Sequence, residues 1–223
     1  MRIACLHTAD SHIALFDAAA RAVSPRLELT HEVRADLLAA AEQAGGLTEA
    51  IAMQTRASLL ALRGGSHAVL LTCSTLGPAV NDAFAKQSAP VPVLRTDAAL
   101  AQRAAEHGGK VVVLCTAPAT FDPTASLFLE AAKRTAAKVD VRLISGAWGL
   151  FKEGDLPAYF SAIAAAADAA YADGADVVAL AQASMTGAAQ RVTRGAIPLT
   201  SPQSGLAAAV AAAALAAQAV ERK

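Results

Sequence analysis

The sequence is poor in aromatic residues and in net charge, and each shortage excludes a class of protein. Aromatic residues make up only 4% of the 223 residues, whereas hydrophobic residues, many of them alanine, make up 55%. This composition favours helices that pack closely through small side chains. The 19 basic and 19 acidic residues cancel and are scattered along the chain, so nucleic acids and anionic membrane surfaces are poor candidate partners.

Cysteine is also scarce, and long hydrophobic runs are missing. The three cysteines, Cys5, Cys73 and Cys115, have no metal-ligand spacing and cannot all pair, so a reducing cytoplasm is the simplest setting. We expect Cys5 and Cys115 to be small buried residues within strands. Residues 1–5 have the pattern of a strand and not of a signal peptide. The alanine-rich tail, residues 206–220, is interrupted by a glutamine and is expected to be a packed terminal helix, not a membrane span.

Apolar strand-like runs alternate with helical patterns along the whole chain. Such alternation predicts a mostly parallel sheet covered by helices on both faces. Strands are expected at residues 3–6, 26–29, 68–72, 91–94, 110–114, 139–144 and 176–180 and around Ile197. Helices are expected at residues 32–43, 48–62 and 156–172, and another is expected to begin with Asp122 as N-cap and Pro123 as the first helical residue.

The segments before and after about residue 100 are similar in size and in the order of their elements. We therefore expect an α/β fold of two pseudo-symmetric Rossmann-like lobes with mostly parallel sheets and a cleft between them. Residues 1–100 would form the first lobe, 101–205 the second, and 206–223 a C-terminal helix that packs back on the lobes. A single doubly wound sheet of nine strands is the alternative.

One segment occurs twice, once with a cysteine and once without. Residues 65–77 and 174–187 each contain a glycine, an apolar run, a small polar elbow and then a helix-compatible stretch. Such an elbow places side chains at the carboxyl end of a strand, where open α/β sheets bind their ligands. If the two copies face each other, Cys73 is opposed by Gln182, or by Ala183 if one residue is inserted.

Short hydroxyl-bearing side chains follow several of the expected strands, next to helix starts. Together with free backbone N–H groups they can bind a carboxylate or phosphate without arginine, although each could instead merely cap its helix. The candidate binding residues are Thr8, Asp10, Ser11, Ser74, Thr75, Thr116, Thr120, Gln182 and Ser184.

Cys73 is the candidate catalytic residue. A thiol at a helix N-terminus has a stabilised thiolate, which makes it a competent base or nucleophile. The alternative is another buried cysteine. His7, His12 and His31 could reach the site or its rim, but a surface or core role is favoured for each.

Four segments, in this order, resemble those of the aspartate/glutamate/hydantoin racemase superfamily. Leu71-Thr72-Cys73-Ser74-Thr75 resembles its first cysteine elbow, and residues 180–184 resemble the second. Residues 113–120 are similar to the strand and threonine loop that open its second half, and residues 198–202 to the segment before its last helix. Asp10 and Ser11 reproduce the Asp-Ser pair of the glutamate racemases without the glycines that follow it there.

The resemblance implies a homodimer that carries out metal-free, cofactor-independent chemistry on the carbon next to a carboxylate. In the racemases one cysteine removes the α-proton and an opposing cysteine delivers a proton to the other face. Cys73 matches the first of these residues, but neither Gln182 nor Ala183 can replace the second. We therefore predict a cytoplasmic enzyme that acts on a small carboxylic acid through a single cysteine, of lyase or isomerase type.

Related activities do not transfer directly. The single cysteine of arylmalonate decarboxylases lies in the second half, and maleate isomerases usually retain both cysteines. A non-catalytic small-acid binding protein on the same fold, or an amino-acid racemase with a non-thiol second base, are the alternatives. A cysteine hydrolase would need a base beside Cys73, and no Cys/His/Asp arrangement is evident in the sequence.

Overall fold

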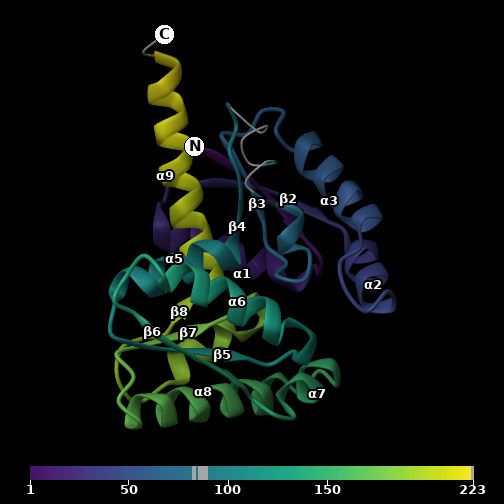
Figure 1. Ribbon diagram of the computed structural model, residues 1–223. Helices are drawn as coiled ribbons and strands as arrows, with labels where there is room; N and C mark the ends of the chain where they lie inside the picture. Colours follow the sequence, from purple (N-terminus) through teal and green to yellow (C-terminus); the bar gives the residue numbers. More distant parts are fainter. Residues whose placement is uncertain (82–83, 85–89, 222–223) are drawn as a thin grey trace. The chain divides into compact units, whose positions relative to one another are not determined.

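The computed structural model describes residues 1–81, Phe84 and residues 90–221, which form two compact units (Figure 1). Unit 1 comprises Met1–Ala99 and Pro202–Lys223, and unit 2 comprises Leu100–Ser201. Each unit contains one four-stranded sheet in which every pairing is parallel. The expected α/β fold of two similar halves is confirmed, and the single nine-stranded sheet is wrong for the described residues.

Unit 1 has the strand order β2-β1-β3-β4. The strands are β1 (Arg2–His7), β2 (Glu28–Val33), β3 (Ala68–Leu71) and β4 (Val93–Arg95). The helices of this unit are α1 (Ser11–Val23), α2 (Ala35–Gln43), α3 (Glu49–Ala61), the short 3-10 helix η1 (Gly77–Ala79) and most of α9 (Ser201–Glu221).

Unit 2 repeats this order as β6-β5-β7-β8. Its strands are β5 (Lys110–Cys115), β6 (Lys138–Leu143), β7 (Val177–Leu180) and β8 (Leu199–Thr200). Its helices are most of α5 (Thr96–His107), η2 (Pro118–Thr120), α6 (Phe121–Ala132), α7 (Ala147–Lys152), α8 (Leu156–Ala172) and η3 (Ala183–Arg191).

The strand alternation of β1 sends its side chains to two different environments. Ala4 and Leu6 pack with Cys73 and with residues of α2 and α3, the helices that lie along one side of the unit 1 sheet in Figure 1. Because neighbouring residues of a strand point to opposite faces, Cys5 and His7 point to the other face. There Phe16 of α1 packs edge-on against His7, with ring centroids 5.0 Å apart.

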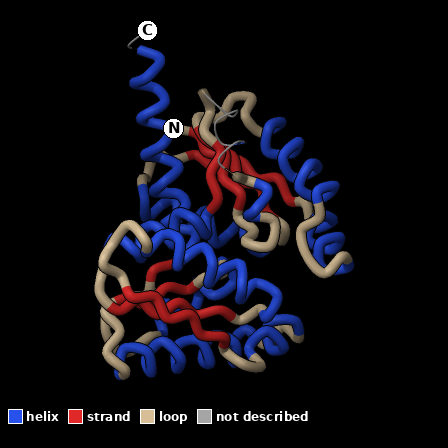
Figure 2. The backbone as a smooth tube through the Cα atoms, viewed as in Figure 1, coloured by secondary structure: helices blue, strands red, loops and turns tan. Residues whose placement is uncertain are grey.

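The unit 2 sheet is likewise covered on both faces, as the helices around its strands in Figure 2 show. Val112, Leu114 and Val178 pack against α7 and α8. Val111 and Val113 pack against α5 and α6 on the opposite face. Both faces of these strands are apolar, which is typical of a parallel sheet buried between helices.

Several expected boundaries are wrong. Ile197 is 64% exposed and precedes β8, because the pairing with β7 involves Leu199 and Thr200. Asp122 is not the N-cap of α6: that position is Thr120, and Phe121 is already helical. The pattern at residues 32–43 predicted a helix throughout, but residues 32 and 33 extend β2 through their pairing with the end of β1.

Three helices, α1, α5 and α7, were not expected. The first begins after Asp10, whose side chain makes no capping hydrogen bond, so the sequence carries only a weak start signal. The alanine-rich tail does form a helix, α9, of 21 residues. Within the described part of the chain, no helix combines the length and apolarity that a membrane crossing requires.

Candidate active site

Cys73 lies two residues beyond β3, in a turn that leads into η1. Its residue surface is only 8% exposed. Four groups hydrogen bond to the sulfur: the hydroxyls of Thr8 and Thr75 and the backbone N–H groups of Thr75 and Leu76. The turn after β3 and the end of β1 therefore converge on this thiol, as the predicted position at the carboxyl end of the sheet requires.

Burial raises the pKa of the Cys73 thiol above its ordinary value of 9.0, and the four hydrogen bonds act in the opposite direction without prevailing. This differs from the stabilised thiolate that the sequence suggested. The physical reason is local: among the described residues, the thiol is followed by a turn and a three-residue 3-10 helix, not by the N-terminus of an α-helix. With its pKa raised, Cys73 is a protonated thiol at neutral pH, and its hydrogen-bond donors are already in place.

The other predicted residues of unit 1 differ in exposure. Thr8 is buried and contacts the Cys73 sulfur, and Ser74 and Thr75 are half-buried in the turn itself. Asp10 and Ser11 are exposed at the start of α1. The Asp10 side chain makes no capping bond to that helix, so its carboxylate is not committed there.

Sequence reasoning missed a buried ion pair beside the Cys73 turn. Arg95, which pairs with Leu71 in the strand register, binds Asp97 through two hydrogen bonds of 2.6 Å each. The two side chains are only 15% and 10% exposed. The guanidinium packs onto Gly77, where an added Cβ would lie 2.6 Å from the central carbon of Arg95. The Arg-x-Asp spacing at the start of α5 was the available signal.

In unit 2, Gln182 occupies the position after β7 that corresponds to Cys73 after β3. Its Oε1 accepts two hydrogen bonds of 2.8 Å, from the backbone N–H and from the hydroxyl of Thr116. Its Nε2 donates to the Thr120 hydroxyl at 3.4 Å, and that hydroxyl donates to the carbonyl of Ala117 at 2.9 Å. The amide is therefore held in one orientation, and one Nε2 hydrogen has no partner among the described residues.

A buried tyrosine extends this network, and sequence reasoning missed it as well. The Tyr159 hydroxyl lies 3.0 Å from the Thr116 hydroxyl and 3.0 Å from the Ser184 hydroxyl. Because the Thr116 hydrogen goes to Gln182, Tyr159 must donate to Thr116, and Ser184 then donates to Tyr159. Burial raises the pKa of Tyr159, so the network stays neutral. In the sequence, Tyr159 is one of the apolar positions of α8, and this pattern predicts only a residue of the hydrophobic core.

The network also shows which predicted unit 2 groups are already engaged. The N–H and hydroxyl of Thr116 are both donated to Gln182, and the Thr120 hydroxyl is donated to a carbonyl. The structure thus gives Thr116 and Thr120 a first task in orienting Gln182. His7 is fully buried and points to the sheet face opposite Cys73, and it is linked to the thiol's turn only through Thr72, whose hydroxyl lies 2.9 Å from Nδ1 of His7, among the contacts of the described residues.

Comparison with known proteins supports a racemase-type fold. A sequence model for the Asp/Glu/Hydantoin racemase family matches residues 8–215, and no curated protein matches the chain. The aspartate racemase of Picrophilus torridus has a TM-score of 0.71 at 12% identity, covering 96% of this chain and 94% of that one. The allantoin racemase of Pseudomonas fluorescens has a TM-score of 0.65 at 21% identity, covering 96% and 92%.

An arylmalonate decarboxylase structure is similar to the same degree, with a TM-score of 0.65 at 16% identity, covering 96% of this chain and 92% of that one. Identities this low establish a shared fold and not a shared reaction. The family match covers nearly the whole chain, including both strand-end turns described above. The chain belongs to the Asp/Glu/hydantoin racemase family.

Proposed function

We propose that the protein is a cofactor-independent enzyme that acts on the carbon next to a carboxylate of a small acid through one cysteine, Cys73. The observation that carries this proposal is the contrast between the two equivalent turns. One holds a thiol surrounded by four hydrogen-bond donors, and the other holds an amide whose oxygen is already saturated by Thr116.

The protonation state of Cys73 favours the role of a proton donor. When a substrate becomes an enediolate, for example by losing CO₂ while the electron pair moves onto the remaining carboxylate, the thiol can protonate the α-carbon. The S–H bond breaks, the C–H bond forms, and the charge passes to sulfur. The donors from Thr8, Thr75 and Leu76 stabilise that thiolate without moving, which is the preorganised stabilisation that enzymes use for developing charge. A proton from water then restores the thiol.

The unit 2 turn offers no second acid or base of this kind. A glutamine amide does not titrate, and Oε1 of Gln182 has no free lone pair to spare. We therefore propose lyase or isomerase chemistry on one face of the substrate, not racemisation by two thiols. The free Nε2 hydrogen of Gln182 is suited to donate to a polar substituent of the acid.

The residues predicted to bind the substrate remain part of this proposal, in two groups. In unit 1 they are Thr8, Asp10, Ser11, Ser74 and Thr75, and in unit 2 they are Thr116, Thr120, Gln182 and Ser184. A homodimer in the cytoplasm is the expected setting.

The test is a deuterium-exchange screen in heavy water, with dicarboxylates, amino acids and aryl-substituted malonates as substrates. We expect deuterium to enter the α-position of product with a single configuration and without racemisation. Cys73→Ala should abolish incorporation while retaining ligand binding, and Cys115→Ala, which removes a buried thiol in unit 2, should retain both. Full activity of Cys73→Ala would exclude the catalytic role.

A non-catalytic small-acid binding protein is the second candidate, and the burial and raised pKa of Cys73 favour it. Thiol chemistry separates the two. If the protein is an enzyme, a ligand that changes the alkylation rate of Cys73 should also exchange its own α-proton. A binder should show ligand protection of Cys73 with no exchange for any acid in the screen.

A further inference from the structure

A cysteine and two histidines gather on the face of the unit 1 sheet opposite Cys73. Cys5 and His7 alternate along β1, and His31 lies beside Cys5 in the register of β2. The Cys5 sulfur and one ring nitrogen from each histidine lie within 4.8 Å of one another. Cys5 and His7 are fully buried, and the His31 side chain is 15% exposed. These three residues are called the Cys–His–His cluster below.

The outer nitrogen of each histidine is already held by a partner. Nδ1 of His7 lies 2.9 Å from the Thr72 hydroxyl, which is also 3.0 Å from the carbonyl of Leu6, so the hydroxyl can donate to the ring or accept from it. Nε2 of His31 lies 3.2 Å from the carboxylate of Asp17 and donates to it. Hydroxyl and carboxylate partners on the far nitrogen are what metal-ligating histidines ordinarily have.

The inner nitrogens of the two histidines face each other across one hydrogen bond. Nε2 of His7 and Nδ1 of His31 are 2.9 Å apart. A metal ion can replace the hydrogen between them, and the Cys5 sulfur is close enough to bind the same ion.

Unit 2 shows that the fold itself does not need this arrangement. Its central strands pair in the same way, with Val113 beside Val141 where unit 1 has Cys5 beside His31. The three equivalent positions hold Val113, Cys115 and Val141, all packed in an apolar cluster. A sheet face filled by apolar side chains is sufficient for this architecture, so the polar cluster calls for a different explanation.

We propose that the Cys–His–His cluster binds one divalent transition-metal ion of the zinc class. The ligands are Sγ of Cys5, Nε2 of His7 and Nδ1 of His31, a sulfur-and-imidazole set suited to zinc or cobalt. Tetrahedral zinc separates such atoms by about 3.3–3.6 Å, so the inner nitrogens need to part by only about half an ångström. The site lies on the opposite face of the sheet from Cys73, and its role is to hold β1, β2 and α1 together.

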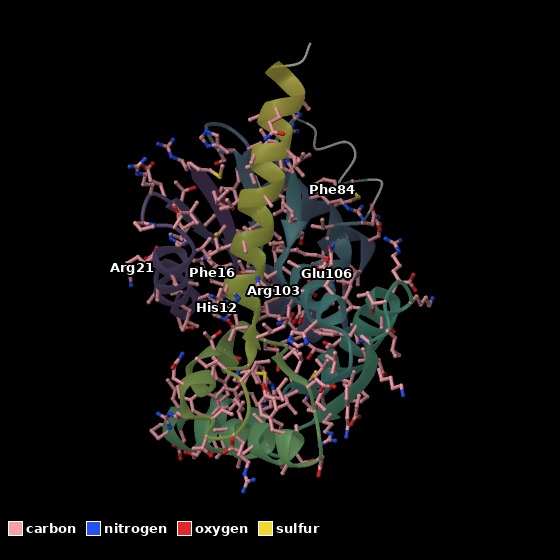
Figure 3. The ribbon with its side chains drawn as sticks, turned by 90° about the vertical axis from the view of Figure 1, so that its left-hand side faces the viewer. His12, Phe16, Arg21, Phe84, Arg103 and Glu106 are labelled. Atoms are coloured by element: carbon pink, nitrogen blue, oxygen red, sulfur yellow. The ribbon has the colours of Figure 1, made fainter. Side chains whose placement is uncertain are left out.

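A fourth donor lies close by on α1. The His12 ring is 6.1 Å from that of His7, and its buried Nδ1 has no hydrogen-bond partner in the described part of the chain. Figure 3 marks His12 and Phe16 on this helix. Phe16 packs against His7 and closes the site with an apolar ring.

The charges of the bound state balance. The two positive charges of the ion are offset by the Cys5 thiolate and the Asp17 carboxylate. On binding, the S–H bond of Cys5 breaks and its proton passes to solvent. The inner hydrogen of the histidine pair is carried instead on Nδ1 of His7, where it can be donated to Thr72, and bonds from the sulfur and the two inner nitrogens to the metal form. Because a cysteine ligand must lose its proton to bind, metal affinity should increase with pH.

The test is titration of the purified, reduced full-length protein with Co²⁺. We expect one equivalent to bind, with the visible spectrum of tetrahedral cobalt and a thiolate-to-cobalt charge-transfer band in the near ultraviolet. Cys5→Ala should remove the charge-transfer band, and Cys115→Ala, its matched control at the equivalent sheet face of unit 2, should retain it. Asp17→Asn should weaken binding about 10- to 100-fold, as the loss of an orienting partner does in other metal sites.

Two results would overturn the proposal: no tetrahedral spectrum in the wild type, or a charge-transfer band that survives Cys5→Ala. If Cys5→Ala does not fold, His31→Ala serves instead, because its side chain lies on the edge strand and its loss must also abolish the tetrahedral spectrum. Competition with Zn²⁺ should bleach the cobalt spectrum and raise the melting temperature of the wild type alone. Neither outcome bears on the catalytic role of Cys73, which is tested by deuterium exchange.

Discussion

Replacing Tyr159 with phenylalanine removes one oxygen from the centre of the unit 2 network. That oxygen donates to Thr116 and accepts from Ser184, each at 3.0 Å, and the tyrosine is fully buried. The two partners are affected differently. Thr116 keeps its donation to Gln182 and loses only an incoming bond, whereas the half-buried Ser184 can turn towards water.

The expected cost follows from these contacts. A neutral hydrogen bond contributes about 0.5–1.5 kcal/mol net, and the ring itself remains to fill its space. The loss of two such bonds, partly compensated at Ser184, should lower the free energy of unfolding by about 1–2 kcal/mol. For a protein of this size, this corresponds to a decrease in melting temperature of roughly 2–8 °C.

The only tryptophan of the chain makes the measurement specific to unit 2. Trp148 stacks on Phe151 with ring centroids 5.1 Å apart, and Phe151 lies 5.2 Å from the Tyr159 ring. Urea unfolding followed by tryptophan fluorescence should show a lower midpoint with an unchanged slope. A double-mutant cycle of Tyr159→Phe with Ser184→Ala should give a coupling energy of about 0.5 kcal/mol or more.

Tyr171→Phe is the matched control, because it removes the other tyrosine hydroxyl of the chain, which hydrogen bonds to the backbone at Val178. It should show no coupling with Ser184→Ala. Equal midpoints for wild type and Tyr159→Phe, or additive effects in the Tyr159 cycle, would refute the contribution of the Tyr159 hydrogen bonds to the unit 2 network.

Three further predictions concern unit 1. Burial raises the pKa of Cys73 above 9.0, so the rate of its alkylation should increase about tenfold per pH unit up to pH 9 and stay below the rate for a peptide thiol. A rate that becomes constant near neutral pH would contradict this. Burial and two neighbouring histidines lower the pKa of His7 to about 3, so between pH 6.5 and 3 the unfolded chain binds the extra proton. In the presence of a chelator, the free energy of unfolding should therefore decrease as the pH is lowered through this window, by up to about 1.4 kcal/mol per pH unit. In urea titrations, His7→Gln should make the free energy of unfolding depend less on pH. Gly77→Ala should lower the free energy of unfolding by about 1–3 kcal/mol, because the new methyl group displaces an Arg95 guanidinium that is fixed by its ion pair. At Gly64 an added Cβ meets nothing within 4 Å, so Gly64→Ala should have little effect in thermal unfolding.

The sequence was sufficient to predict the features that depend on local pattern. Apolar runs at residues 68–72 and 176–180 predicted β3 and β7, and the polar residues after them lie in the turns as expected. The racemase-type fold followed from the order of four short segments. The expected boundary of β2 was misplaced by several residues, and this matters because the pairing of Cys5 with His31 depends on that strand's register.

Contacts between distant residues could not be predicted in the same way. Tyr159 lies 43 residues from Thr116, and nothing in an alanine-rich helix shows that one of its apolar positions carries a hydroxyl into a polar network. The ionisation of Cys73 was also out of reach, because it depends on the balance between dehydration and four donors, two of them backbone groups. A pattern of residue types shows which groups are near a strand end, but not how much water reaches them.

The two units share one backbone plan and differ in where they place groups that can change their charge. Near the carboxyl ends of its strands unit 1 carries a protonated thiol at Cys73 and a pair of hydrogen-bonded imidazoles at His7 and His31. The equivalent network in unit 2 consists of threonine, glutamine, tyrosine and serine, and the pKa of its tyrosine is raised further by burial. Such a network orients a hydrogen-bond donor but exchanges no proton near neutral pH. Any pH dependence of the proposed reaction in that range should therefore originate in unit 1 or in the substrate, and substitutions in the unit 2 network should change substrate affinity more than the shape of the pH profile.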